Sequence, residues 1–214
     1  IKGEVPQHQL AAIYEPMIGF TVQGKKTLSI GKHVIHAPGP SYYIIPTDIP
    51  ATAQVHQGKN GLAYLSIGLR LNLHAVQDLL KDYADEESEE PPHCGFAACP
   101  MTEKPLDAWL RLLRLLKAPR DIPALAAVYE REILYRALQG PQGWQLRQLC
   151  FADGSAGKIH KTIQWIREHY TQPIDIGPLA EKSGMAVTTF HRQFKQITGL
   201  SPVQFQKQLR LLEA

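Results

Sequence analysis

IDIGPLAEKSGMAVTTFHRQFKQITGLSP, residues 174–202 of this 214-residue chain, is the stretch that decides the fold of its last quarter. Asp175 can cap a helix that has Pro178 in its first turn, where a missing N–H is tolerated. Gly184 supplies a residue that can take positive φ, and a second helix follows over 187–198. The spacing therefore predicts two short helices joined by a tight turn.

Small residues in this stretch predict how the two helices cross. Ala180 lies four residues before Gly184, so a methyl group sits where the helices would meet near a right angle. A larger side chain there would separate them, and the arrangement is typical of a helix-turn-helix unit. We expect the scaffold of the unit to consist of Leu179, Ala180, Gly184, Phe190 and Phe194.

The outer face of the 187–198 helix carries hydrogen-bonding and cationic side chains. An arginine there can bind O6 and N7 of guanine in the major groove, and a threonine methyl group can contact that of thymine. The pattern predicts binding to double-stranded DNA, with Arg192 as the strongest candidate, while His191 and Lys195 are also consistent with a solvated surface. The candidate DNA-binding residues are Thr188, Thr189, His191, Arg192 and Lys195.

Two more helices and a charge bias accompany this unit. Residues 158–214 contain eight Lys or Arg against four Asp or Glu, whereas residues 1–157 contain fifteen against sixteen, and such an excess suits a surface that meets a polyanion. Helical spacing predicts one helix before the unit and one after it. Their inner faces are Ile159, Ile163, Ile166 and Tyr170, and Phe205, Leu209 and Leu212 after Ser201-Pro202.

The first two thirds of the chain predict antiparallel strands followed by helices. Short β-prone runs separated by glycine and proline turns are typical of an antiparallel barrel or sandwich. The runs are 17–23, 27–30, 33–36, 42–45, 53–57 and 62–71. Helices are expected after a cap at Asn72 and over 106–117, 122–139 and 144–150, with a surface loop over 85–105.

The helical faces and the domain boundary are also predicted. Asp121 is expected to cap the 122–139 helix, and the glycine-rich segment 153–157 marks the boundary. This gives a sensor or dimerisation domain over 1–154, with a helical segment at about 106–150, and a helix-turn-helix subdomain with the start of a linker helix over 155–214. The expected inner faces are Trp109, Leu110, Leu113 and Leu116, and Leu125, Val128, Tyr129 and Ile133.

Enzymatic and metal chemistry find little support. His33 and His36 would point to opposite sides of a strand, so they cannot both enter one interior without a bulge. Nucleophile elbows and phosphate-binding loops are absent from the sequence, so we expect no enzyme activity, no metal and no cofactor.

No run of about 20 apolar residues is present, which predicts a cytoplasmic protein outside the membrane. Three sparse cysteines, at 94, 99 and 150, are expected to be inert thiols.

The helix-turn-helix motifs resemble those of the AraC-type regulators. The likeness lies in Leu179 to Met185, Phe190 to Lys195 and Thr198 to Pro202, which match the first of that family's two helix-turn-helix units. Residues nearer the amino terminus resemble the cupin-like domain of one branch of the family. These are Gln23 to Lys26, Tyr42 to Pro50, Glu132 to Arg136 and Gly140 to Gly143.

The resemblance implies a fold and a set of partners. The expected class is α+β, with an amino-terminal antiparallel cupin-like β-barrel and helices, followed by an all-α helix-turn-helix domain. The family likeness places Thr188, His191 and Arg192 on the base-contacting face and implies an activator that forms a homodimer and positions RNA polymerase. Ala186 departs from the family pattern, which usually has a capping serine there. Family members also continue into a second helix-turn-helix unit, so we expect this chain to be truncated after the first unit.

Two other interpretations stay open. The chain could be a small-molecule or metal-binding cupin, with or without enzyme activity, whose helical tail merely packs against the barrel. It could instead be a truncated interaction module that pairs with full-length regulators and antagonises them.

Overall fold

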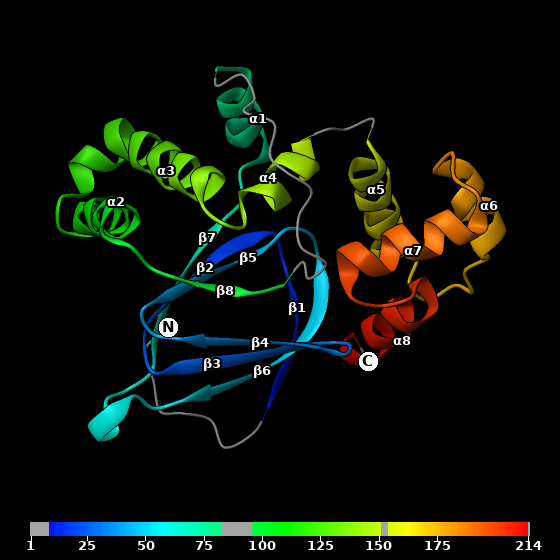
Figure 1. The fold of residues 1–214 in the computed structure, drawn as a ribbon, viewed down its shortest axis with the longest axis horizontal. Helices are drawn as coiled ribbons and strands as arrows, with labels where there is room; N and C mark the ends of the chain where they lie inside the picture. Colours follow the sequence, from blue (N-terminus) through cyan, green and yellow to red (C-terminus); the bar gives the residue numbers. More distant parts are fainter. Residues whose placement is uncertain (1–8, 83–95, 151–153, 214) are drawn as a thin grey trace.

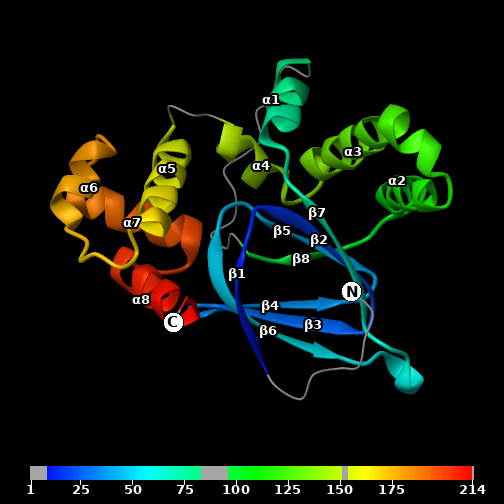
Figure 2. The ribbon, with the colours of Figure 1, turned by 180° about the vertical axis from the view of Figure 1, so that it is seen from behind.

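A computed structural model describes residues 9–82, 96–150 and 154–213. The chain forms a two-sheet β-sandwich, a group of helices over one sheet, and a second group of helices beside the sandwich (Figure 1). The view from behind shows the same three parts and places the carboxyl-terminal helices next to β1 (Figure 2). Antiparallel strands followed by an all-α unit confirm the predicted fold class.

Each sheet has four antiparallel strands, ordered β1-β6-β3-β4 and β7-β2-β5-β8. Strand alternation explains the sandwich, because successive side chains point to opposite faces and the inward set is apolar. The inward set between the sheets includes Leu28, Ile30, Ile45 and Ile49, all fully buried. The strands are β1 Leu10–Tyr14, β2 Met17–Gln23, β3 Lys25–Ile30, β4 His33–Pro38, β5 Ser41–Ile45, β6 Ile49–His56, β7 Leu65–Arg70 and β8 Ala98–Pro100.

Four helices cover the outer face of the β7-β2-β5-β8 sheet. Phe20 on β2 lies against Trp109, with their ring centroids 5.8 Å apart, and Leu134 is buried in the same cluster. Asn72 caps the first of these helices as predicted, because its side-chain oxygen accepts from the Ala75 N–H at 3.2 Å. The helices are α1 Leu73–Asp82, α2 Glu103–Arg114, α3 Ile122–Gln139 and α4 Gly143–Cys150. Two short 3-10 turns, η2 Leu115–Lys117 and η3 Pro119–Asp121, join α2 to α3, and a third, η1 Lys59–Gly61, joins β6 to β7.

The remaining helices form a separate core beside the sandwich. Ile159, Ile163 and Ile166 are fully buried, as their spacing predicted, whereas Tyr170 lies beyond the end of its helix and is half-buried. Ser201 caps the last helix with a capping box, at the position where the sequence predicted that helix to begin. The helices are α5 Ser155–Glu168, α6 Ile176–Lys182, α7 Val187–Thr198 and α8 Pro202–Leu212.

Several local predictions were wrong. Leu116 is 71% exposed, because α2 gives way to a 3-10 turn at Leu115 and the buried face runs instead through Ala108, Trp109 and Leu115. Val128 is also exposed, and Asp121 makes no side-chain cap since its own backbone is already helical. The other contradicted positions are Leu110, which is exposed, and Gly157, which lies inside α5 and not in a link.

Two strands were missed by the sequence prediction. β1 begins at Leu10, and β8 at Ala98–Pro100 lies inside the segment that we expected to be a surface loop. Residues 83–95, which carry the acidic run and Cys94, lie outside the described residues. Cys99 is a buried free thiol, and the side chain of Cys150 is not described.

Candidate nucleic-acid interface

The turn between α6 and α7 has the geometry that its sequence predicts. The Asp175 side chain accepts from the Gly177 N–H at 3.1 Å and caps α6. Gly184 has φ +62°, a value that favours glycine, and its N–H donates to the Glu181 carbonyl at 2.8 Å. Ala180 is 1% exposed beneath this turn. A small residue and a left-handed glycine therefore hold the two helices close together.

Three aromatic rings anchor α7 to the helices around it. Phe190, Phe194 and Phe205 are fully buried, and Leu179 on α6 is 5% exposed in the same cluster. The ring centroids of Phe190 and Phe194 lie 5.8 Å apart, and those of Phe194 and Phe205 lie 5.5 Å apart nearly edge to face. Aromatic pairs at such separations favour offset or edge-to-face packing. Of the predicted scaffold residues, Leu179, Ala180, Phe190 and Phe194 thus meet in one core and fix the rotation of α7 about its axis, whereas Gly184 lies exposed in the turn.

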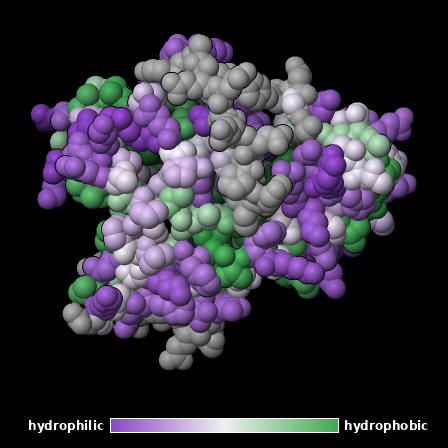
Figure 3. All heavy atoms as spheres, viewed as in Figure 1, coloured by the Kyte–Doolittle hydropathy of each residue, from purple (hydrophilic) through white to green (hydrophobic). Residues whose placement is uncertain are grey.

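The opposite face of α7 is polar and cationic. Thr188, Arg192 and Lys195 are exposed, whereas Thr189 and His191 are half-buried. Across residues 9–82, 96–150 and 154–213, the side chains of these five residues make no hydrogen bond or ion pair. Hydrophilic side chains dominate the surface over α7 on the side shown in Figure 3. The structure therefore groups Thr188, Arg192 and Lys195 on one accessible face and gives Thr189 and His191 less access.

The first turn of α7 has no side-chain cap. Ala186 has the extended backbone of a cap residue, with φ −64° and ψ 147°, yet a methyl group cannot accept a hydrogen bond from the N–H groups that follow. These N–H groups at the start of α7 are thereby left to solvent or to another acceptor.

A buried polar contact joins α5 to the sandwich, and no sequence signal revealed it. Arg167 on α5 pairs with Asp48, whose side chain is 3% exposed, and His160 Nδ1 lies 2.9 Å from Thr47 Oγ1. Burial raises the pKa of Asp48, although Arg167 and His160 oppose this shift. Burial also lowers the pKa of His160, against the pull of Asp48. More than 110 residues separate these partners in sequence, so spacing alone could not pair them.

A second contact joins the β3–β4 turn to the α7–α8 turn. Gly31 has φ +57°, and a Cβ placed on it would lie 2.6 Å from Leu200 and 2.8 Å from the Gly199 carbonyl oxygen. Gly199 has φ +73°, and a Cβ there would lie 3.1 Å from His33 and 3.2 Å from Ile30. Each turn thus needs a glycine for two reasons: its backbone takes a left-handed φ, and the other turn lies too close to leave room for a side chain.

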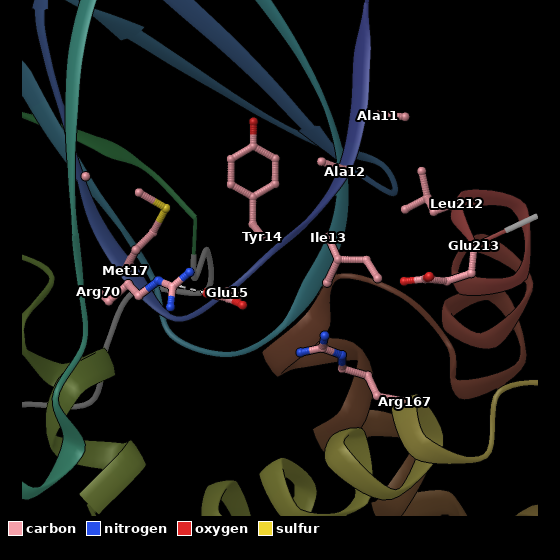
Figure 4. Close-up of a pocket in the computed structure, with 11 residues that line it drawn as sticks. Ala11, Ala12, Ile13, Tyr14, Glu15, Met17, Arg70, Arg167, Leu212 and Glu213 are labelled. Atoms are coloured by element: carbon pink, nitrogen blue, oxygen red, sulfur yellow. Dashed lines mark ion pairs between the residues drawn. The ribbon is translucent and has the colours of Figure 1, made fainter. Parts of the chain in front are cut away.

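A cavity of about 540 Å³ lies between the edge strands of the two sheets and the end of α8. Tyr14 and Met17 line its sandwich side, and Arg70, which pairs with Glu15 at 3.0 Å, lies at its rim together with Arg167 (Figure 4). The cavity therefore lies where the sandwich meets the carboxyl-terminal helices.

Behind the wall of this cavity, Lys26 enters the sandwich. Its ammonium group donates to Tyr43 Oη at 2.9 Å and lies 4.7 Å from the centroid of the Tyr14 ring. Burial lowers its pKa to about 8. Lys26 stood out in the sequence only as part of a family motif, and nothing in its neighbourhood predicted this environment.

Candidate metal ligands are scattered in the described part of the chain. Within it, no three His, Cys, Asp or Glu side chains gather in a way that could hold a metal ion. His36 is exposed and His33 packs near Phe96, so the two histidines do lie on opposite faces of β4. Within residues 9–82, 96–150 and 154–213, no helix combines the length and the apolar character needed to cross a membrane.

Sequence comparisons match both parts of the chain. Residues 1–145 match the family described as AraC-type transcriptional regulator N-terminus, and residues 166–207 match bacterial regulatory helix-turn-helix proteins of the AraC family. The HTH-type transcriptional activator RhaS of Pectobacterium carotovorum is 35% identical over 101 residues, 45% of this chain and 34% of that protein. RhaS of Salmonella schwarzengrund is 31% identical over 107 residues, 49% of this chain and 37% of that protein. The chain spans about a third of the length of these relatives.

Solved structures show weaker similarity. Unsaturated fatty acid bound ToxT from Vibrio cholerae has a TM-score of 0.39 and 10% identity, with 95% of this chain and 96% of that chain covered. The AraC-like transcriptional activator CuxR has a TM-score of 0.35 and 12% identity, with 96% and 72% covered. The family assignment rests on the sequence matches, one of which covers more than half of the chain. This protein belongs to the AraC-type transcriptional regulators.

Proposed function

We propose that this protein is a sequence-specific DNA-binding transcription regulator that reads the major groove with α7. The observation that carries the proposal is the face of Thr188, Arg192 and Lys195. These side chains are exposed and have no polar partner among the described residues, while the other face of the helix is fixed by buried phenylalanines. An α-helix fits the major groove, and arginine bound bidentately to guanine is the commonest specific contact there. We assign base contact to Arg192 and Thr188, and phosphate contact to Lys195, with Thr189 and His191 at the margin.

The wider role follows from family membership. We propose that the protein is an activator that positions RNA polymerase in the cytoplasm and has no enzymatic activity, and the activator names of its relatives support the first point. The 1–154 domain would sense a small molecule, for which the cavity beside β1 is the candidate site. It would also form a homodimer, and the exposed Leu116 and Val128 on the helices beside the sandwich support that role.

The test is selection of DNA sequences from a pool of randomised duplexes by the full chain, followed by binding to the enriched duplex over a range of salt concentrations. We expect an enriched sequence and a log–log slope of about −0.9 for each phosphate that is neutralised. Arg192→Ala should weaken binding by about 1–3 kcal/mol and relax the preference at one base pair.

Arg120→Ala is the matched control, because Arg120 is also exposed but lies on η3, beside the sandwich. It should change neither affinity nor sequence preference. Failure to enrich any sequence, together with binding that ignores salt, would contradict the function. Equal weakening by Arg192→Ala at every sequence would make Arg192 a phosphate contact.

A further inference from the structure

The tip of the β3–β4 hairpin lies beside the carboxyl-terminal end of α7. Gly31 at this tip approaches Leu200 and Gly199 so closely that a Cβ would overlap both, and Gly199 in turn faces Ile30 and His33. The hairpin tip therefore has a fixed position relative to α7, although it belongs to the other part of the fold. Lys32, the next residue after Gly31, is exposed at that position.

An open groove of about 400 Å³ runs between this tip, the end of α7 and the exposed side of α8. Three lysines line it, one from each element: Lys32, Lys195 and Lys207. Its other polar side chains are Gln204 and Gln208, and none of its lining residues is acidic. Within the described ranges none of the three lysines makes an ion pair or a side-chain hydrogen bond. The groove thus gathers three uncompensated positive charges.

We propose that Lys32 of the β-sandwich, together with Lys195 and Lys207, binds the DNA phosphate backbone that borders the groove read by α7. This inference rests on the proposed function and adds a DNA contact from the 1–154 domain. Arg192 and Lys195 are three residues apart and share one face of the helix. A helix in a major groove about 12 Å wide has a phosphate strand on either side, and the lysines extend the α7 surface toward one of them.

The chemistry of the groove favours a polyanion over a small anion. Lys32, Lys195 and Lys207 are all exposed, so none is a desolvated donor of the kind that would hold a single phosphate or carboxylate. Exposed ammonium groups bind a nucleic acid well because each contact releases condensed counterions. Side-chain amides such as those of Gln204 and Gln208 also commonly donate to phosphate oxygens.

The experiment compares Lys32→Gln with the parent full-length chain on a fluorescein-labelled mixed-sequence duplex over a range of salt concentrations. Loss of one phosphate contact should reduce the magnitude of the log–log slope by about 0.9 and weaken binding about five- to tenfold at ~0.1 M salt. The weakening should be the same for every duplex sequence. Lys32→Glu should weaken binding further. Thermal unfolding of each variant should match the parent, because the side chain is exposed and has no polar partner among the described residues.

Lys59→Gln is the matched control, since Lys59 is an exposed lysine of the same domain on η1, at the end of the sandwich away from α7 (Figure 1). It should leave the slope unchanged. Equal slopes for Lys32→Gln, Lys59→Gln and the parent would overturn the inference while Arg192→Ala still reports on the proposed function. A parent chain whose binding does not depend on salt would overturn both.

Discussion

At the scale of single residues, neighbouring positions on α7 have opposite environments. Phe190 and Phe194 are fully buried, while Arg192, midway between them, is exposed. Two residues along an α-helix correspond to a rotation of about 200°, so burial of the two rings turns the guanidinium to the far side. The exposure of Arg192 is thus a consequence of core packing.

Ala186 offers a prediction at this scale. Its backbone already has cap geometry, so Ala186→Ser would place a hydroxyl where it can accept from the Thr188 or Thr189 N–H. We expect the free energy of unfolding, measured with urea, to rise by about 1 kcal/mol. Ala127→Ser on the exposed side of α3 has no N–H to cap and should lower it slightly. Equal effects of the two substitutions would show that α7 gains nothing from a cap.

At the scale of elements, amphipathic helices were predictable where one face alone is apolar. The 187–198 helix has that property, and its bounds match α7. The 106–117 segment has leucines around most of its circumference, so periodicity left more than one possible inner face and the predicted face through Leu116 was wrong. β8 is three residues long, too short for any alternation to show. An element is therefore predictable from sequence when it is long enough to show a periodicity and when only one of its faces is apolar.

Gly184 and Gly199 provide a matched pair at this scale. Both take left-handed φ, at +62° and +73°, so alanine at either position should cost roughly 1–2 kcal/mol of unfolding free energy. A Cβ at Gly184 would meet only the end of Lys158 at 3.6 Å, whereas one at Gly199 would press on Ile30 and His33. We expect Gly199→Ala to be the more destabilising of the two in urea unfolding. Equal costs would contradict the tight approach of the β3–β4 turn.

At the scale of the whole molecule, the sandwich and the carboxyl-terminal helices meet through two different kinds of contact. One is the close fit of the Gly31 and Gly199 turns, and the other is polar and buried, through Asp48 and Arg167. Asp48 is buried and Arg167 is half-buried, so removing Arg167 would leave a buried carboxylate uncompensated, whereas the intact pair adds little net stability because both groups lose water. The position of Lys32 relative to α7 depends on both contacts.

Acidification should lower the free energy of unfolding because His160 becomes protonated. Burial holds the pKa of His160 below its ordinary value of 6.5. The stability that the neutral imidazole contributes is therefore fully present above pH 6.5 and is lost as the pH falls through the lowered pKa. Asp48 acts in the opposite sense, because burial raises its pKa above 3.8 and its contribution declines as the pH rises. We expect the urea unfolding free energy to fall between pH 7.5 and pH 5.5, and to fall less in His160→Gln. His74→Gln, at an exposed histidine on α1, should behave as the parent does. An equal fall in His160→Gln and the parent would show that this histidine does not couple folding to pH.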